Sequence, residues 1–377
     1  MKTEVGSIIY FDHNATTTLA PEALVKMNET FQLPLNNSAN HQLGRLATKL
    51  VDGSRQELTN LLNAQNYEII FTGSSSEANN QVLYGTDATT ILFCKFEHSS
   101  IYNCRSSDKK IIEIEALGNG LIDVSDLEKK LSSVQGSFLL SLMLANNETG
   151  AIQPVAEIAK LVHQNGGLIH CDAVAAIGKI AVDLEKLNVD FASISAHKIN
   201  GPQGVGALLM RKGLDIKPLI YGGKQEKSKR AGTLNIAGIA GFGEACKLAH
   251  KKILAHENVK KLRDFLESEI QKIGGENVLI FSKSVERLPN TSYIATKNSD
   301  AQTQLINFDL NRICVSAGSA CSSGALSESR ILKAMNIDPT FSTSAIRVSL
   351  APENTEDEIK KFIKVWSEFY HRITQIK

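Results

Sequence analysis

The sequence is short of the features that mark several classes of protein. Its 377 residues include 41 basic and 40 acidic side chains, which leaves a formal net charge of +1. This balance does not favour binding to nucleic acid or to a membrane surface, because both are helped by an excess of positive charge. No apolar run is long enough to cross a bilayer, and Met1 to Gly6 contain no apolar signal segment. We therefore expect a cytoplasmic protein with no membrane contact and no direct binding of nucleic acid.

Cysteine is scarce and scattered. The six cysteines form no Cys-x-x-Cys pair, so the sequence gives little support for a zinc site, and a disulfide framework is not expected in a reducing compartment. Cys94 and Cys171 lie in apolar runs and are expected to be packing residues. Cys321 differs, because small residues surround it on both sides. This setting predicts an accessible loop and suits a nucleophile.

The order of the expected elements indicates an α/β fold. Apolar strands alternate with amphipathic helices, which is typical of a mainly parallel sheet covered on both faces. Strands are expected at 68–71, 90–93, 110–114, 138–144, 168–171, 191–195 and 206–210.

The pattern changes after Thr233. A long helical segment at about 236–273 is followed by short strands and a C-terminal helix from about residue 355. We predict a large α/β domain, 15–255, and a smaller α+β domain that combines 1–14 with 256–377.

The carboxyl ends of the strands in such a sheet are where ligands bind. After the first strand, Thr72 to Glu77 combine small hydroxyl side chains with the free N–H groups of a helix start, which can bind an anion. The alternative is that Ser75 or Ser76 only caps the helix. In the same way, Ser125 is a candidate cap for a helix at 124–131.

Three further strand ends carry candidate residues. His98 could stack on a planar ligand or transfer protons, or it could simply lie in solvent. Asn147 could bond the polar edge of a ligand, or only build a turn. Asp172 follows an apolar strand and needs a partner, because an unpaired buried carboxylate is costly. That partner could be a protonated pyridine nitrogen, a helix end or an internal cation.

The last strand end contains Ser195, His197 and Lys198, before a glycine-rich segment. Burial lowers the pKa of a lysine, and a neutral amine can form a Schiff base with an aldehyde. Considered alone, Lys198 would more simply be a charge that reaches water. Together, however, a phosphate site, a ring neighbour, an aspartate for a pyridinium and a lysine for an aldehyde match the requirements of pyridoxal phosphate.

Arg347 lies within the apolar segment 345–350. Its planar guanidinium suits bidentate capture of a carboxylate, or an internal ion pair with a carboxylate of the same domain. The residues alone leave both possibilities open.

The combination resembles the cysteine desulfurases of the NifS/IscS type, which are class V, fold-type I pyridoxal-phosphate enzymes. The resemblance covers nearly the whole chain, and the small residues around Cys321 are similar to those of group I, which has the longer cysteine loop. It is carried by the segments 12–17, 147–150, 195–198, 230–233 and 316–321.

The resemblance implies a role for each candidate residue. Lys198 would hold the cofactor and move protons, Asp172 would pair with the ring nitrogen, and His98 would stack on the ring. The cofactor would also bind Asn147, and its phosphate would be held by Ser75, Ser76, Ser195 and His197. Thr233 would reach a phosphate in the other subunit, which implies a homodimer.

The resemblance also implies the reaction. Asn147 and Arg347 would bind the carboxylate of L-cysteine, and the Cys321 thiolate would attack its sulfur. The products would be L-alanine and a persulfide on Cys321. The persulfide would pass to an acceptor protein, such as an iron–sulfur scaffold or a tRNA-thiolation protein.

Several positions depart from the family pattern. Ala175 stands where a glutamine usually bonds the phenolic oxygen of the cofactor, and Lys224-Gln225 replace a glycine-histidine pair. The segment 73–77 and Asn36-Asn37 also differ from the usual residues. We expect an active but slow or specialised member. The alternatives are a selenocysteine lyase, a class V aminotransferase, which Cys321 argues against, or a non-catalytic homologue that acts as a scaffold.

Overall fold

A computed structural model describes residues 8–104, 108–318 and 329–375, and its main feature is a seven-stranded sheet. The strand order is β2-β8-β7-β6-β5-β3-β4. β8 runs antiparallel to β2 and β7, and the other neighbours are parallel. The predicted mainly parallel sheet is confirmed. Its strands are β2 (Tyr67–Thr72), β3 (Thr90–Cys94), β4 (Lys110–Ile114), β5 (Phe138–Met143), β6 (Leu168–Asp172), β7 (Phe191–Ser195) and β8 (Gly206–Arg211).

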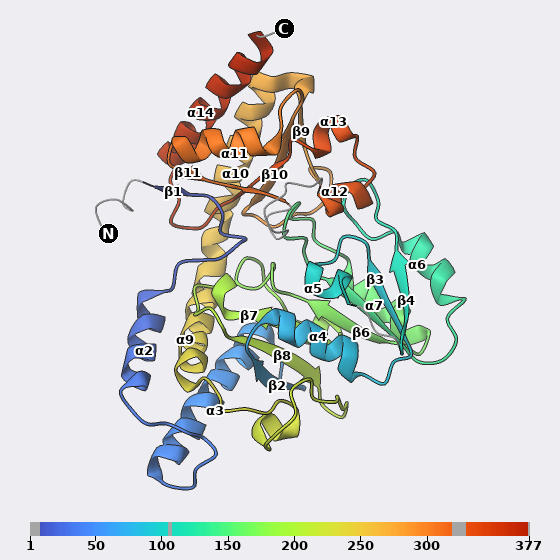
Figure 1. Cartoon of the computed structure of the whole chain (residues 1–377), viewed down its shortest axis with the longest axis vertical. Coiled ribbons are helices and arrows are strands. Elements are labelled where there is room, and N and C mark those ends of the chain that lie inside the picture. Colours follow the sequence, from blue (N-terminus) through green and yellow to red (C-terminus); the bar gives the residue numbers. More distant parts are fainter. Residues whose placement is uncertain (1–7, 105–107, 319–328, 376–377) are drawn as a thin grey trace.

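Helices cover both faces of this sheet (Figure 1). Successive residues of a strand point to opposite faces, and here both kinds are buried: Ile91 and Leu92 belong to different hydrophobic clusters. One cluster includes α4 and α5, and the other includes α3, α6, α7 and α9. The helices of this part are α2 (Pro21–Phe31), α3 (Gln42–Leu62), α4 (Ser75–Gly85), α5 (Ser99–Tyr102), α6 (Val124–Leu131), α7 (Val155–Gln164), α8 (Leu184–Leu187) and α9 (Ile236–Lys252).

A smaller antiparallel sheet, in the order β12-β13-β10-β9, lies in the upper part of Figure 1 with the C-terminal helices. Its core contains Phe308 stacked on Phe362 at 4.5 Å between ring centroids. The elements are β9 (Val278–Ile280), β10 (Thr291–Thr296), β12 (Ser316–Ala317), β13 (Ile346–Ser349), α10 (His256–Gly274), α11 (Ala301–Leu310), α12 (Arg330–Ala334), α13 (Pro339–Ser342) and α14 (Glu356–Gln375).

The N-terminus joins this second part. β1 (Ile9–Tyr10) pairs in parallel with β11 (Ile313–Cys314), and Phe11 lies fully buried in the same cluster as Phe308. The domain boundaries at residues 14 and 255 stay a prediction.

Two local expectations need correction. The long helical segment is two helices, α9 and α10, joined by a 3-10 turn at Ile253–Ala255. The cap of α6 is Asp123, whose side chain accepts from the Asp126 N–H at 3.1 Å, whereas Ser125 lies inside the helix. An aspartate just before the helix accepts this bond well, so no serine is needed. Within the described residues, no helix is long and apolar enough to span a membrane.

Candidate functional site

A cavity of about 480 Å³ lies where the carboxyl ends of β5, β6 and β7 face the second sheet. Residues far apart in the sequence line it because parallel strands end at the same edge. Thr233 is not among the lining residues and is exposed. The other expected site residues within the described ranges all line the cavity: Ser75, Ser76, His98, Asn147, Asp172, Ser195, His197, Lys198 and Arg347.

The start of α4 forms one end of the cavity. Its cap is Ser74, whose hydroxyl accepts from the Glu77 N–H at 3.1 Å, so neither Ser75 nor Ser76 has the capping role considered above. Gly206 of β8 lies against this turn, and a Cβ there would come within 2.6 Å of the Ser74 carbonyl carbon. The glycine therefore lets the strand approach a helix start whose N–H groups and dipole favour an anion.

Lys198 follows β7 in the 3-10 turn Ala196–Lys198. It lines the cavity, and its Nζ donates to the carbonyl oxygens of Asn14 and Ala15, the latter at 3.0 Å. The neighbouring His197 bonds Thr16 Oγ1 through Nδ1 at 3.1 Å. Burial, followed by the positive charges of Lys198 and Lys179, lowers the pKa of His197 to about 4. The imidazole is therefore neutral at pH 7.

Asp172 lies at the end of β6 and is 6% exposed. It accepts two neutral hydrogen bonds, from Asn79 Nδ2 at 2.9 Å and from the Val174 N–H at 3.0 Å. Among the described residues, no cation forms a salt bridge with it. A buried carboxylate without a cation, in the wall of a cavity, suits a positively charged ligand group.

His98 is the cap of α5, and its Nδ1 accepts from the Ser100 N–H at 3.2 Å. Burial lowers its pKa, the positive charges of Lys198 and Arg330 lower it further, and Asp172 opposes them. The ring is part of the cavity wall and not a solvated side chain.

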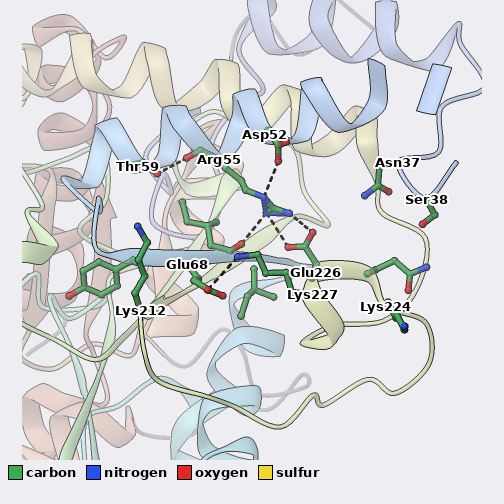
Figure 2. Close-up of a pocket in the computed structure, with 14 residues that line it drawn as sticks. Asn37, Ser38, Asp52, Arg55, Thr59, Glu68, Lys212, Lys224, Glu226 and Lys227 are labelled. Carbon is green, nitrogen blue, oxygen red and sulfur yellow. Dashed lines mark hydrogen bonds and ion pairs between the residues drawn. The ribbon is translucent and has the colours of Figure 1, made fainter. Parts of the chain in front are cut away.

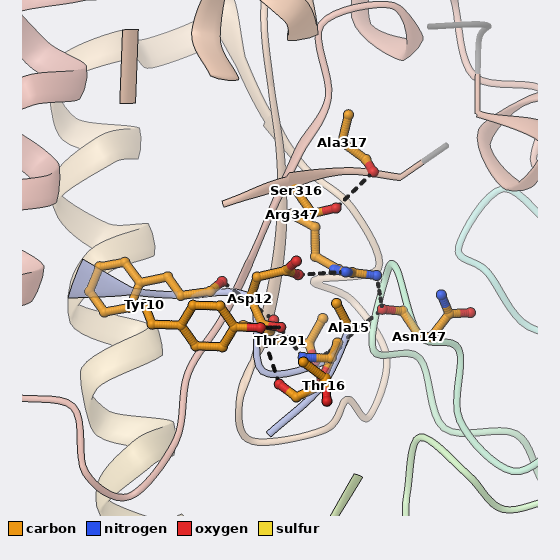
Figure 3. A network of polar contacts seen from close by, with 12 residues as sticks. Tyr10, Asp12, Ala15, Thr16, Asn147, Thr291, Ser316, Ala317 and Arg347 are labelled. Atoms are coloured by element: carbon orange, nitrogen blue, oxygen red, sulfur yellow. Dashed lines mark hydrogen bonds and ion pairs between the residues drawn. The ribbon is translucent and has the colours of Figure 1, made fainter. Parts of the chain in front are cut away.

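Arg347 reaches the cavity from the middle of β13 (Figure 3). It forms an ion pair with Asp12 Oδ1 at 2.7 Å and donates to the Asn147 carbonyl oxygen at 3.2 Å. Its Nε is buried and lacks a hydrogen-bond partner among the described residues. The internal ion pair is therefore present, and Arg347 is also one of the residues that line the cavity. The Asn147 side-chain amide points away from this network (Figure 3).

Cys321 lies outside the described residues. The residues that flank its segment on either side both meet Glu148. A Cβ on Gly318 would lie 2.1 Å from Glu148 Oε2 and 2.1 Å from Tyr293 Oη, and Ser329 Oγ donates to Glu148 Oε2 at 2.7 Å. Burial raises the pKa of Glu148. Glu148 follows Asn147 in the same loop and was not among the predicted site residues.

Two more residues near the cavity were missed. Asn79 is 1% exposed and bonds Asp172. Lys179 is 6% exposed and donates to the Ala175 carbonyl oxygen at 2.8 Å; burial, with Lys198 and Arg347, lowers its pKa to about 7. The apolar neighbours of Lys179 in the sequence were the available signal for its burial.

A second hollow, of about 710 Å³, lies between α3, β2 and the segment that contains Lys224 and Gln225 (Figure 2). Its centre is an ion pair between Arg55 and the buried Glu226, at 2.5 Å, and Glu226 also accepts from the Phe71 N–H at 2.9 Å. The departures at Lys224 and Gln225 thus line this hollow and not the cavity of Lys198.

Comparison with known proteins shows similarity over almost the whole chain. Residues 9–362 match the family model for aminotransferase class V. A cysteine desulfurase of Cereibacter sphaeroides is 38% identical, over 95% of this chain and 94% of its own length. The cysteine desulfurase IscS of Dictyoglomus turgidum is 36% identical, over 98% and 96%. The X-ray structure of a NifS-like protein from Rickettsia africae has a TM-score of 0.90 at 38% identity, covering 97% of this chain and 99% of that one.

Proposed function

Because the chain belongs to the class-V aminotransferase family and, within it, to the cysteine desulfurases of the NifS/IscS type, we propose that it removes sulfur from L-cysteine. The observation that carries the proposal is that Lys198, Arg347 and Asp172 line the same cavity. Asp172 is a buried carboxylate and has no salt bridge to a described residue. Such a cavity can hold a cationic ring and a carboxylate substrate side by side.

The cavity residues fit pyridoxal phosphate, which when bound supplies an electron sink for the substrate's α-carbon. Asp172 would face the ring nitrogen, and the neutral His98 would cover the ring. Lys198 Nζ would hold the aldehyde carbon and later move the proton at the α-carbon. The phosphate would bind at the start of α4, with Ser75, Ser76, Ser195 and His197.

Substrate and nucleophile would meet on the side of the second sheet. Arg347 and Asn147 would bind the cysteine carboxylate, and the position of both residues in the lining of the cavity supports this assignment. The Cys321 thiolate would attack the substrate sulfur, so that one S–S bond forms and one C–S bond breaks. L-cysteine and the Cys321 thiol together give L-alanine and a Cys321 persulfide, a balance that needs no external oxidant.

We also propose that the enzyme is a homodimer and that it passes the sulfur to an acceptor protein. Thr233 is exposed and lies outside the cavity of its own chain, which suits a contact with the partner's phosphate. Leu219, Ile220 and Tyr221 precede it and are also exposed, Tyr221 at 77%. Exposed apolar residues of this kind suit a protein interface. A persulfide acceptor such as an iron–sulfur scaffold would complete the reaction.

The test is a spectrum and a product assay. The purified protein with pyridoxal phosphate should absorb as a bound cofactor, form alanine from cysteine and gain one sulfur on Cys321 by mass spectrometry. Cys321→Ser should keep the absorbance and form no persulfide. Persulfide formation by that variant would show that the nucleophile is wrongly assigned.

The same assay separates the alternatives. Preferential turnover of selenocysteine, or transfer of the amino group to a keto acid, would indicate one of the other two reactions. A wild-type protein that takes up no cofactor would favour the scaffold.

A further inference from the structure

Asn79 joins two parts of the cavity wall. It lies on α4 and is 1% exposed. Its Nδ2 donates to Asp172 Oδ2 and to Ser100 Oγ, both at 2.9 Å. Ser100 Oγ in turn lies 2.8 Å from Nδ1 of His98. One amide therefore connects the carboxylate at the end of β6 with the imidazole beyond the end of β3.

One arrangement of hydrogens satisfies these contacts. As a carboxylate, Asp172 can only accept, so the Asn79 atom that faces it must be the NH₂ nitrogen. The Ser100 backbone N–H can only donate, and it points to His98 Nδ1 at 3.2 Å. Nδ1 therefore carries a lone pair, and the hydroxyl hydrogen of Ser100 must point to it as well. The proton of the neutral ring of His98 is then on Nε2.

A packing role alone does not explain an asparagine here. Asn79 Oδ1 is buried and has no hydrogen-bond partner among the described residues. Leaving a buried amide oxygen unpaired costs stability, which an apolar side chain of similar size would avoid. The donor half of the amide is therefore the part that the site uses.

We propose that Asn79 is a positioning residue for the cofactor ring, an inference that rests on the proposed function. It fixes the Asp172 carboxylate with a neutral donor and, through Ser100, holds His98 as the neutral Nε2–H tautomer. The charge of Asp172 stays uncompensated by His98 and available to the ring nitrogen. A neutral imidazole can also lie on a cationic ring without charge repulsion.

The test uses Asn79→Leu with Gln81→Leu as its matched control. Gln81 is a fully buried amide on the same helix, also with an unpaired oxygen, and it donates to the Lys229 carbonyl oxygen at 2.7 Å and not to Asp172. Asn79→Leu should raise the dissociation constant of pyridoxal phosphate, measured by equilibrium dialysis, by about 10- to 100-fold. Gln81→Leu should change it less than three-fold.

A second readout needs no cofactor. In the cofactor-free wild type, the ¹⁵N shifts of His98 should show an unprotonated Nδ1 and a protonated Nε2 at neutral pH. Asn79→Leu should raise the pKa of His98 and move its ¹⁵N shifts toward a mixture of tautomers. If Asn79→Leu does not fold, Ser100→Ala tests the same link, since it should move the His98 shifts in the same direction.

Equal dissociation constants and equal His98 shifts in Asn79→Leu and Gln81→Leu would overturn the inference. Neither readout involves cysteine. A wild type that binds the cofactor but forms no alanine, together with a weakened Asn79→Leu, would therefore contradict only the proposed reaction. An active wild type with an unaffected Asn79→Leu would contradict only the role of Asn79.

Discussion

The large sheet and the small sheet hold their charges at the cavity in different ways. On the large sheet, Asp172 is bonded by neutral donors at a strand end, with no salt bridge to a described residue. On the small sheet, Arg347 lies in mid-strand and is paired with Asp12 at 2.7 Å. The large-sheet wall, the side of the cavity that contains Asp172, keeps a negative charge available for a ligand. In the small-sheet wall, the side that contains Arg347, the positive charge is already paired, so Arg347 must exchange Asp12 for the carboxylate of a ligand when one binds.

Lys198→Ala breaks the chemistry of the large-sheet wall and should have the largest effect. The variant lacks the amine that would hold the cofactor and move the proton, so alanine formation should fall by at least about 100-fold. Amino-acid analysis after incubation with cysteine measures this loss. A variant with more than a tenth of the wild-type rate would show that another group moves the proton.

Asp12→Asn tests the satisfied charge of the small-sheet wall. Removing one partner of a largely buried pair leaves Arg347 uncompensated, so the cofactor-free protein should lose about 1–3 kcal/mol of unfolding free energy. Saturating L-alanine should reduce the loss, because its carboxylate can replace that of Asp12. Urea unfolding with and without L-alanine measures both values. An equal loss in the two conditions would mean that the carboxylate does not take the place of Asp12 at Arg347.

Gly318→Ala probes the contact of the small sheet with Glu148. The new Cβ would lie 2.1 Å from two buried oxygens, so the variant should be less stable by about 1–3 kcal/mol. Gly53→Ala is the control, since Gly53 is within α3 and a Cβ there meets nothing within 4 Å. That substitution should stabilise the protein by up to about 1 kcal/mol. Equal thermal midpoints for the two variants would contradict the contact.

Acid should act mainly through buried histidines. The pKa values of His170, His197 and His256 are lowered to about 4, chiefly by burial. The unfolded chain therefore binds protons between about pH 6.5 and pH 4 that the folded chain does not bind, and stability should fall as the pH drops through this window. Chemical unfolding at several pH values measures the slope. His197→Gln should make it shallower, and an unchanged slope would mean that His197 is protonated in the fold.

Much of the sheet and cavity could be predicted from the sequence, because strand ends and small polar loops are local signals. The role of Asn79 could not be predicted, because its partner Asp172 is 93 positions away. Two adjacent asparagines in a helix, Asn79 and Asn80, are more typical of a polar surface. The pair of Arg347 with Asp12 spans 335 positions and leaves no local trace.

Predictions of helix caps were wrong where neighbouring residues are chemically able to cap the same helix. Ser74 and Asp123 cap their helices although Ser75, Ser76 and Ser125 are close by, and backbone geometry decides between such neighbours. The break between α9 and α10 could not be predicted from residue type, because Ile253–Ala255 contain neither proline nor glycine. The contact expected of Thr233 needs a second subunit and cannot be read from one chain.

The N-terminal segment lies beside strands from the end of the chain, and this position decides when the cavity can form during synthesis. Asp12 and Asn14 line the cavity, and they are held there by Arg347 and Ser349 of the last strand, the latter through an Asn14 N–H bond of 2.9 Å. Contacts of such long sequence separation form late, because closing a long loop costs entropy before the contact can repay it. On the ribosome, the first segment must wait until almost the whole chain has been synthesised. The cavity is then completed only at the end of translation, and a chain shortened before β13 would have no finished site to fill.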